Sequence, residues 1–328
     1  MSFTIRHTYG STPFSQIMSG FQGLTPQSLR DAVTGKDRTL VYSFGCDRSA
    51  GFGADYLGFV GKLMWCLQND VGFRFGEVRR PVGFITARGW TDYFEPFCEE
   101  ARGPLLDKLN VHAFPYARRL PFLKTFAGAW LRATVQPASD YFSFDALDQV
   151  TGQGQRGIAA NDFLKDRQAL IEVLWRYNAQ TLREVRQIKE QANLLPESSS
   201  YFAICVRRGD KLMEHGYVGV QRYVQAIAQH AGSLRTLFLA TDDASVVDEV
   251  RKALPDFNVL TLTDPASKGY VHRDFSSLPA SERRRQTLRF FAQLELMRDA
   301  RFFIGSRTTN VSWMANALRG GDGVHWVD

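Results

Sequence analysis

The feature that most constrains the fold is a regular alternation of strand-like and helix-like segments from residue 201 onward. Short runs rich in β-branched and aromatic residues predict strands at 201–206, 236–240, 259–262, 302–304 and near 324. Apolar residues at helical spacing predict helices at 220–231, 245–253, 282–299 and from about 310. Such a βαβ series favours a parallel sheet with helices on both faces, because parallel strands need a crossover between them.

The amino-terminal half carries the same pattern in a less regular form. A strand is expected at 40–44, a glycine turn at 51–53, a helix at 56–67 and a second strand around 82–86. From 165 to 195 an apolar stripe at helical spacing predicts one long helix, which Pro196 ends. We therefore expect two α/β portions on either side of a connecting helix.

The length of 328 residues suggests two domains of similar size, at roughly 150 residues each. We expect an N-terminal α/β domain at 1–160, the connecting helix at 161–195 and a C-terminal α/β domain at 196–328. Hydrophobic residues make up 44% of the chain and charged residues 23%. This composition excludes disorder and coiled coil as the main state of the chain.

The charge balance narrows the classes of partner. Forty Lys and Arg against 34 Asp and Glu give a net charge of +6, which permits an anionic partner. We find no basic stripe with interleaved aromatic residues, so we expect no nucleic-acid partner. The one basic run, 283–285 beside Glu282, is expected to be a solvated helix start. We find no uncharged apolar run of about 18 residues, so we expect no membrane segment in this chain.

The sequence lacks several motifs of metal and covalent chemistry. No Walker A sequence, serine nucleophile elbow or HExxH occurs, and no Asp-x-Asp stands where a metal–diphosphate clamp would lie. The four cysteines have no CxxC spacing, which favours reduced thiols over disulfides or zinc ligands. They are Cys46, Cys66, Cys98 and Cys205. Any phosphate bound here would be met by arginines and backbone amides instead of a metal ion.

Three polar loops follow three of the expected strands at their carboxyl ends. They begin at Arg207, at Thr241 and at Gly305. Ligands of a doubly wound sheet bind beyond the carboxyl ends of its strands, at the point where the strand order reverses. We therefore expect the three loops to converge on one crevice.

Two adjacent arginines, Arg207 and Arg208, stand at the first of these strand ends. In an extended chain their side chains point to opposite sides, and each planar fork needs an anion. Phosphate oxygens suit such a fork, at about 1.5–3 kcal/mol for each charge-assisted hydrogen bond. The structural alternative is that Arg208 pairs internally with Asp210 or Asp242.

The third loop and an amino-terminal glycine pair could also contact phosphate. The backbone amides of a helix starting near Asn310 form an anion seat, beside the hydroxyls of the third loop. Ordinary N-capping is the alternative explanation for Thr308 and Thr309. Gly51 and Gly53 would let the backbone approach a pyrophosphate, with a plain turn as the alternative.

In their order along the chain, these segments resemble the α1,6-fucosyltransferases, both the core-fucosylating animal enzymes and the bacterial nodulation enzymes. CVRRGDK at 205–211 resembles their first motif, FLATDD at 238–243 their second and FFIGSRTTNV at 302–311 their third. GFG at 51–53 and GWTDYFEP at 89–96 also match in order and rough spacing. The resemblance covers the chain from about residue 40 to its end.

This resemblance implies a GT-B-like fold, in which two Rossmann-like domains face each other across a cleft. The domain at 196–328 would bind the nucleotide sugar and the one at 1–160 would lie on the acceptor side. The implied reaction is an inverting transfer of L-fucose from GDP-fucose to a glycan hydroxyl, with no metal ion and no cofactor besides the donor. We expect the cytoplasm for the chain as written, or the Golgi lumen if a longer chain carries an upstream anchor.

Carried over by position, the family implies a phosphate site made of two motifs. Arg207 and Arg208 would hold the diphosphate and ribose and stabilise the GDP leaving group. Ser306, Thr308 and Thr309 would complete the phosphate seat.

The family also implies roles for the acidic residues near the arginines. Asp210, Lys211, Asp242 and Asp243 would shape the acceptor side and hold the arginine loop. A glutamate shortly after the lysine acts as catalytic base in the animal enzymes. Glu214 is the candidate here, one residue closer to the lysine than the family pattern.

Two positions depart from the family pattern and leave alternatives open. Cys205 stands where the family has histidine, and Gln293 stands where the animal enzymes have a carboxylate, with Glu295 two positions on. These departures motivate a second hypothesis, a transferase that uses another nucleotide sugar. The displaced Glu214 motivates a third, a sugar-nucleotide binder without turnover.

Overall fold

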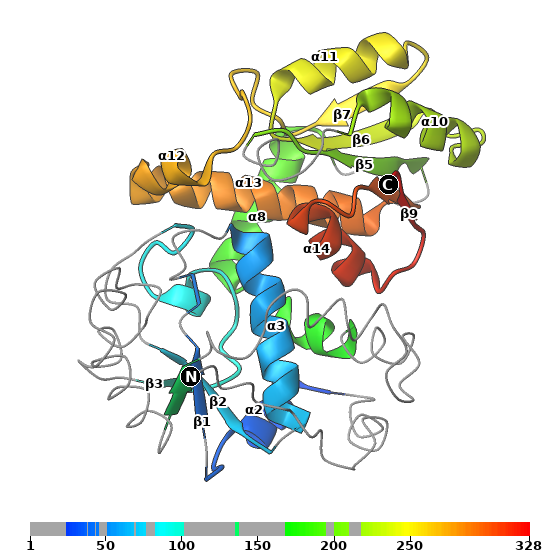
Figure 1. Cartoon of the computed structure of the whole chain (residues 1–328). Helices are drawn as coiled ribbons and strands as arrows, with labels where there is room; N and C mark the ends of the chain where they lie inside the picture. Colours follow the sequence, from blue (N-terminus) through cyan, green and yellow to red (C-terminus); the bar gives the residue numbers. More distant parts are fainter. Residues whose placement is uncertain are drawn as a thin grey trace, which may run out of the picture.

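The structure of the chain is a computed structural model. It describes residues 24–37, 39–42, 44–45, 51–68, 70–76, 83–101, 135–137, 168–194, 200–209 and 218–328. The described strands form two separate parallel sheets, of order β3-β2-β1-β4 and β7-β6-β5-β8-β9. Figure 1 shows the two sheets in different parts of the molecule, with helices between them.

The amino-terminal part builds the four-stranded sheet. Its elements are α2 (Pro26–Val33), β1 (Thr39–Tyr42), α3 (Phe52–Gln68), β2 (Gly72–Gly76), the 3₁₀-helix η1 (Gly89–Asp92), β3 (Glu100–Ala101) and β4 (Val135–Pro137). β1 pairs in parallel with both β2 and β4. The strand and the helix expected on either side of the glycine turn are therefore both present.

The carboxyl-terminal part builds the five-stranded sheet. Its elements are α8 (Ala179–Gln191), β5 (Phe202–Val206), α10 (Val220–His230), β6 (Thr236–Thr241), α11 (Ala244–Ala253), β7 (Asn258–Thr261), α12 (His272–Ser277), α13 (Ala280–Asp299), β8 (Phe303–Gly305), α14 (Asn310–Arg319) and β9 (Val324–Trp326). Every strand and helix predicted from residue 201 onward is confirmed. From β5 the chain runs outward to β6 and β7 and then returns to β8 on the other side of β5. The strand order thus reverses between β5 and β8, which is where such sheets bind ligands.

The prediction of a strand around residues 82–86 is wrong for residues 83–86, the part that the structure describes. The second strand lies earlier, at Gly72–Gly76, and residues 83–86 form a turn and an irregular segment. Their backbone groups are used locally: the Phe84 carbonyl accepts the Tyr93 hydroxyl, and the Thr86 N–H donates to the Asp92 carboxylate at 2.7 Å. These local hydrogen bonds satisfy backbone groups that would otherwise pair with a neighbouring strand.

The single helix predicted from 165 to 195 is also wrong, because it is broken. Residues 168–174 are helical, and α8 begins only at Ala179, after Asn178 accepts the Thr181 N–H at 2.8 Å as N-cap. Between the two helices, Trp175 and Tyr177 pack into an aromatic cluster around Phe94. Burial of these two rings outweighs the helical spacing of the segment. The domain boundaries at 160 and 195 stay predictions.

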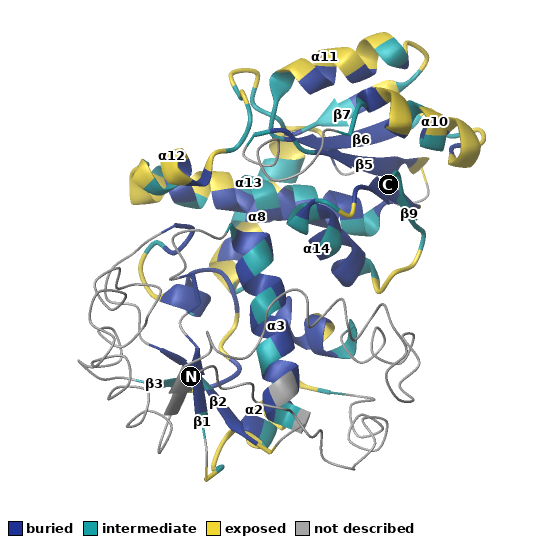
Figure 2. Ribbon diagram, viewed as in Figure 1, coloured by how far each residue is buried: buried dark blue, intermediate teal, exposed yellow. Residues whose placement is uncertain are grey.

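One hydrophobic core connects the two sheets. It includes Phe94, Phe52 from α3 and Phe291 from α13. The ring centroids of Phe52 and Phe291 lie 4.8 Å apart. A second cluster covers the opposite face of the five-stranded sheet under α10 and α11. In Figure 2 these two helices show exposed outer faces, whereas α13 and α14 are largely buried. α13 is therefore an internal element between the two halves.

The basic run at the start of α13 is less solvated than the sequence analysis predicts. The helix does begin there, but Arg283 is only 8% exposed and is not solvated. Arg283 donates to the carbonyls of Leu278 and Ile85, and Arg284 donates to the Asp92 carbonyl and to Glu184. The two guanidinium groups thus join the two halves of the molecule.

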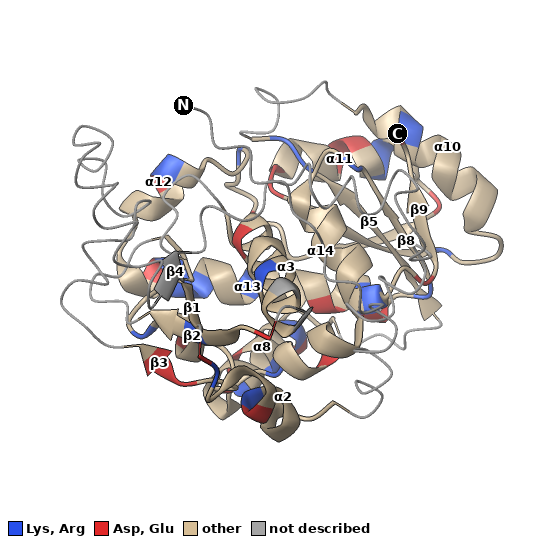
Figure 3. Ribbon diagram, turned by 60° about the horizontal axis from the view of Figure 1, so that its bottom comes forward, with Lys and Arg blue, Asp and Glu red and all other residues tan. Residues whose placement is uncertain are grey.

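Lys and Arg are otherwise spread over both halves of the described chain (Figure 3). Among the described helices, none has both the length and the apolarity needed to cross a membrane.

Candidate functional site

A cavity of about 700 Å³ lies where the carboxyl ends of β5, β6 and β8 meet the amino-terminal half. Its wall combines residues 51–54 and Phe84 with the strand-end loops, the segment 262–271 and one face of α13. Six of the residues expected at the site line it: Gly51, Gly53, Arg207, Asp242, Gln293 and Thr309. All three predicted loops therefore contribute to one cavity.

Arg207 brings a guanidinium group to the cavity wall. Its side chain is 15% exposed, and its Nη1 lies 3.4 Å from Oδ2 of Asp242. The guanidinium also lies over the ring of Tyr270, at 5.4 Å from the ring centroid. The carboxylate and the aromatic ring hold this cation at the end of β5, where it can meet an anionic ligand.

Arg208 points away from the cavity, as expected for alternating side chains on an extended strand. It is 5% exposed and does not line the cavity. Its Nη1 donates to the Val218 carbonyl and its Nη2 to Glu249, each at 3.3 Å. The guanidinium is therefore paired internally, but with Glu249, whereas the structural alternative named Asp210 or Asp242. Asp242 accepts the Arg208 backbone N–H on Oδ1 at 2.9 Å.

Asp242 connects the arginine loop to the segment that carries Tyr270. Its Oδ2 accepts the Tyr270 N–H at 2.8 Å, while Oδ1 accepts the Arg208 N–H. The two segments touch at Gly209, which has φ +51°, and a Cβ there would lie 2.2 Å from the Tyr270 carbonyl oxygen. Only glycine fits this position, because both the backbone angle and the contact exclude a side chain.

The third loop ends in the N-cap of α14. The Thr309 hydroxyl accepts the Ser312 N–H at 3.1 Å, so the expected N-capping is confirmed, and Thr309 also lines the cavity with Asn310. Ser306 and Thr308 do not line it. Their hydroxyls bond to each other at 2.6 Å, and Ser306 donates to Asp328. The start of α14, where the helix dipole is positive, thus lines the cavity.

The two glycines of the amino-terminal half line the opposite wall. A Cβ on Gly53 would lie 3.2 Å from Met314 Cγ and 3.3 Å from the Asn310 carbonyl oxygen. The absence of a side chain at Gly53 therefore lets α3 pack closely against α14. Gly51 leaves room opposite Tyr270, because a Cβ there would lie 4.0 Å from the phenol oxygen.

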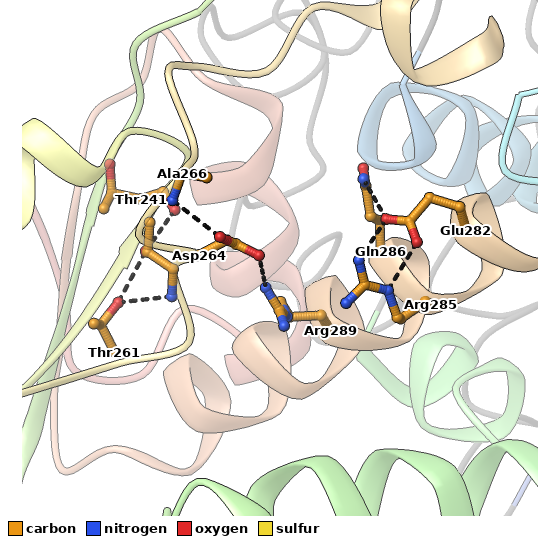
Figure 4. Close-up of polar contacts among 9 residues, drawn as sticks. Thr241, Thr261, Asp264, Ala266, Glu282, Arg285, Gln286 and Arg289 are labelled. Carbon is orange, nitrogen blue, oxygen red and sulfur yellow. Dashed lines mark hydrogen bonds and ion pairs between the residues drawn. The ribbon is translucent and has the colours of Figure 1, made fainter. Parts of the chain in front are cut away.

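The cavity has a polar wall on α13, of which the sequence suggested Gln293 but neither Arg285 nor Arg289. Arg285, Arg289 and Gln293, each four residues apart, all line it. Figure 4 shows Asp264 between the Ala266 N–H and Arg289, with Oδ2 3.3 Å from Arg289 Nη1. The Ala266 N–H, and then Arg289, lower the pKa of Asp264.

Arg285 is neutralised by a carboxylate on its own helix. It donates two hydrogen bonds of 2.8 Å to Glu282, which also accepts from Gln286 (Figure 4). These bonds, the one from Arg285 first, lower the pKa of Glu282. The α13 wall therefore offers paired charges and an amide, a surface suited to polar ligand groups.

Two other predicted positions lie away from the cavity lining. Asp243 caps α11 by accepting the Ser245 N–H at 2.9 Å. Cys205 is fully buried within β5, and burial raises the pKa of its thiol to about 12. Cys66 and Cys98 are likewise buried and free, as expected for reduced thiols.

Asp210, Lys211, Glu214 and Cys46 lie outside the described residues. Within the described ranges, no cluster of three or more His, Cys, Asp or Glu side chains could hold a metal ion.

Comparison with known proteins shows which solved structures share this architecture. No family model and no curated protein sequence matches the chain. The chain is similar to POFUT1 in complex with GDP-fucose, with a TM-score of 0.53 and 10% identity over 90% of this chain and 99% of that one. The apo-form of POFUT1 gives a TM-score of 0.51 at 10% identity, over 89% and 98%.

The fucosyltransferase NodZ from Bradyrhizobium is also similar, with a TM-score of 0.48 and 14% identity over 86% of this chain and 92% of that one. The match to POFUT1 confirms the expected GT-B-like fold of two parallel α/β sheets, since it spans nearly the whole of both chains. The resemblance stated from the sequence motifs is thereby confirmed for the fold.

Proposed function

We propose that this protein transfers L-fucose from GDP-fucose to a hydroxyl group of a glycan, with inversion and without a metal ion. The fold supports the proposal, because the chain is similar over 90% of its length to a protein solved with GDP-fucose. The ordered motifs at the ends of β5, β6 and β8 support it from the sequence.

The observation that carries the proposal is the shared cavity of Arg207 and the α14 start. A volume of about 700 Å³ suits a nucleotide sugar, since ligand pockets span about 300–1,000 Å³. Arg207, the N-cap Thr309 and the first residue of α14, Asn310, line this one space. A planar cation and a helix N-terminus are both groups that bind phosphate oxygens well.

In the proposed reaction the bond between the sugar C1 and the β-phosphate oxygen breaks, and its electron pair stays on the phosphate. Negative charge therefore builds on the β-phosphate as the sugar becomes oxocarbenium-like. A guanidinium already held by Asp242 and Tyr270 stabilises this charge more in the transition state than in the ground state. Arg208, anchored by Glu249, supports the loop that carries Arg207.

A transferase that uses another nucleotide sugar is the second candidate. It is favoured by Cys205, which is buried away from the cavity, and by Gln293, which lines it. A carboxylate at this position would accept hydrogen bonds only, and would therefore select a nucleotide base that donates them. The amide of Gln293 both donates and accepts, so it does not make this selection.

Calorimetric titration with GDP, UDP and dTDP tests both candidates. We expect GDP alone to bind, and Arg207→Ala to abolish most of the binding. Arg251→Ala, an exposed arginine on α11, is the matched control and should bind as the wild type does. Preferential binding of UDP or dTDP would favour the second candidate.

Turnover is tested by incubation with GDP-fucose and a glycan acceptor array, read by mass. A mass gain of one fucose on an acceptor supports the proposal. GDP binding with neither transfer nor donor hydrolysis would support the sugar-nucleotide binder and contradict the proposed enzyme.

A further inference from the structure

A chain of three polar side chains runs from the cavity wall into buried structure. The Tyr270 hydroxyl lies 2.9 Å from Nδ1 of His272, and Nε2 of His272 lies 3.3 Å from the Ser276 hydroxyl. Tyr270 lines the cavity, whereas His272, the first residue of α12, is 9% exposed. The imidazole therefore reaches the cavity through the phenol.

The hydrogen-bond geometry accommodates the tautomer of His272 that has its proton on Nε2. With the proton on Nε2, that nitrogen donates to the Ser276 oxygen and Nδ1 accepts the Tyr270 O–H. Nδ1 then has a lone pair directed at the phenol proton. In this arrangement Nδ1 can accept the phenol proton of Tyr270 at the moment when the phenol oxygen accepts a proton from a ligand.

Tyr270 is fixed relative to the group proposed to hold the phosphate. Its backbone N–H donates to the same Asp242 carboxylate that faces Arg207. Its ring packs under the Arg207 guanidinium, at 5.4 Å. A cation over the ring stabilises the electron density of the phenol as its proton leaves.

The phenol also faces the half of the molecule expected to bind the acceptor. A Cβ placed on Gly51 would lie 4.0 Å from the Tyr270 oxygen, and one on Gly83 would lie 3.8 Å from His272 Cε1. The pair thus stands at the junction between Arg207 and the amino-terminal half. An acceptor hydroxyl that attacks the donor sugar must enter between these same two walls.

We infer that Tyr270 is a catalytic residue that accepts the proton of the acceptor hydroxyl, with His272 as its positioning residue and proton acceptor. As the acceptor oxygen bonds to C1 of the sugar, its proton moves to the Tyr270 oxygen and the Tyr270 proton moves to Nδ1 of His272. The electron pair of the broken C1–O bond leaves with the nucleotide diphosphate. The resulting imidazolium then releases its proton to water.

This inference rests on the proposed function, and it assigns the proton transfer to residues other than Glu214, the base implied by the family resemblance. The assignments of the proton acceptor to Tyr270 and to Glu214 predict different activities for the variants of these two residues. If Tyr270 accepts the proton, Glu214→Gln keeps substantial transfer activity while Tyr270→Phe does not.

The test compares Tyr270→Phe and His272→Gln with the wild type in transfer from GDP-fucose and in GDP binding. Phenylalanine keeps the ring under Arg207 but carries no proton, and glutamine still accepts a hydrogen bond from Tyr270 but takes no proton. We expect each to lower kcat by about 10²-fold. Donor KM and GDP affinity should stay at wild-type values. His230→Gln, an exposed histidine at the end of α10, is the matched control and should keep the wild-type kcat.

A rescue experiment separates proton transfer from packing. Imidazole added to His272→Ala should restore kcat, while imidazole added to Tyr270→Phe should not. Wild-type kcat in Tyr270→Phe, or loss of GDP binding together with transfer, would overturn the inference and leave the proposed function standing. A wild-type protein without any transfer would overturn the proposed function, and this inference with it.

Discussion

The Asp242 carboxylate holds Tyr270 in place by accepting its backbone N–H at 2.8 Å. The other oxygen of the same carboxylate accepts the Arg208 N–H, and the Arg207 guanidinium lies beside it. One side chain therefore sets the relative positions of the loop after β5 and the segment before α12. The positions of Arg207 and Tyr270 in the cavity wall therefore depend on this residue.

Replacing Asp242 with asparagine should weaken both the fold and the site. The amide keeps one acceptor, but its NH₂ group would face an N–H donor, and the partner of Arg207 would lose its charge. Leaving a buried donor unsatisfied costs about 1–3 kcal/mol in the free energy of unfolding. Urea denaturation and GDP titration measure the two effects. Asp248→Asn on the exposed face of α11 should change neither.

Although Arg207 and Arg208 are adjacent, replacing each with alanine should have different effects on activity and on stability. Arg207→Ala removes a cation from the cavity wall and should lower kcat by about 10²- to 10³-fold with little change in melting temperature. Arg208→Ala should lower the melting temperature as well, because it leaves the Val218 carbonyl and Glu249 without this partner. Scanning calorimetry and transfer assays on both variants measure the difference. Equal melting temperatures in the two variants would contradict it.

Gly53 should tolerate a side chain much less well than Gly58. Both lie in α3, but a Cβ at Gly53 meets Met314 and the Asn310 carbonyl, whereas nothing lies within 4 Å of one at Gly58. Both substitutions replace glycine by valine within one helix, so the difference in stability mainly reports the contact of residue 53 with α14. We expect Gly53→Val to be less stable than Gly58→Val by about 1–3 kcal/mol in denaturant unfolding.

Glu295 forms a shielded ion pair that should be costly to break. Its Oε2 lies 2.5 Å from Lys189 Nζ, with side chains 10% and 14% exposed. Glu295→Gln leaves the lysine charge buried without its counter-ion and should cost about 3–5 kcal/mol in unfolding free energy. The double variant Lys189→Met and Glu295→Leu should recover most of that loss. If the single and double variants are equally unstable, the pair does not act through its charges.

The buried thiols should make the protein less stable at alkaline pH. Burial raises the pKa of Cys98 and of Cys205 from an ordinary value of 9.0 to about 12. Between these pH values the unfolded state has lost protons that the folded state keeps, so the free energy of unfolding falls as pH rises. Denaturation curves at several pH values should show this slope, and Cys205→Val should make it shallower.

The same burial predicts chemical protection. In a Cys46→Ser background, Ellman's reagent at neutral pH should modify no thiol of the native protein and three after denaturation, since Cys66, Cys98 and Cys205 are all buried. Reaction of a native thiol would contradict the burial of these residues.

The carboxyl-terminal sheet was predictable because its strands are apolar runs closed by polar loops. β2 was not, because Gly72–Gly76 is short and has glycine at both ends, which weakens any strand pattern. The break before α8 was missed for another reason. Trp175 keeps helical spacing with the residues before it, and only tertiary packing shows that its ring belongs to a core shared with Phe94.

The candidate site was predictable where it follows strands and was missed where it does not. Arg207, Asp242 and Thr309 stand at strand ends, so topology alone brings them together. Tyr270 comes from an irregular segment whose position depends on its contact with Gly209. Arg289 looks like any charge on an amphipathic helix, and the sequence does not tell which helix faces a cavity.

The contacts of Arg283 and Arg284 across the two halves determine which substitutions the junction can tolerate. In the amino-terminal half both guanidinium groups bond to peptide carbonyls, those of Ile85 and Asp92. Every amino acid supplies the same carbonyl, so mutations that preserve the path of the backbone at residue 85 leave this junction intact. The junction therefore depends on the identity of the two arginines and on the backbone path of the segment that receives them, and it is indifferent to the side chain at residue 85.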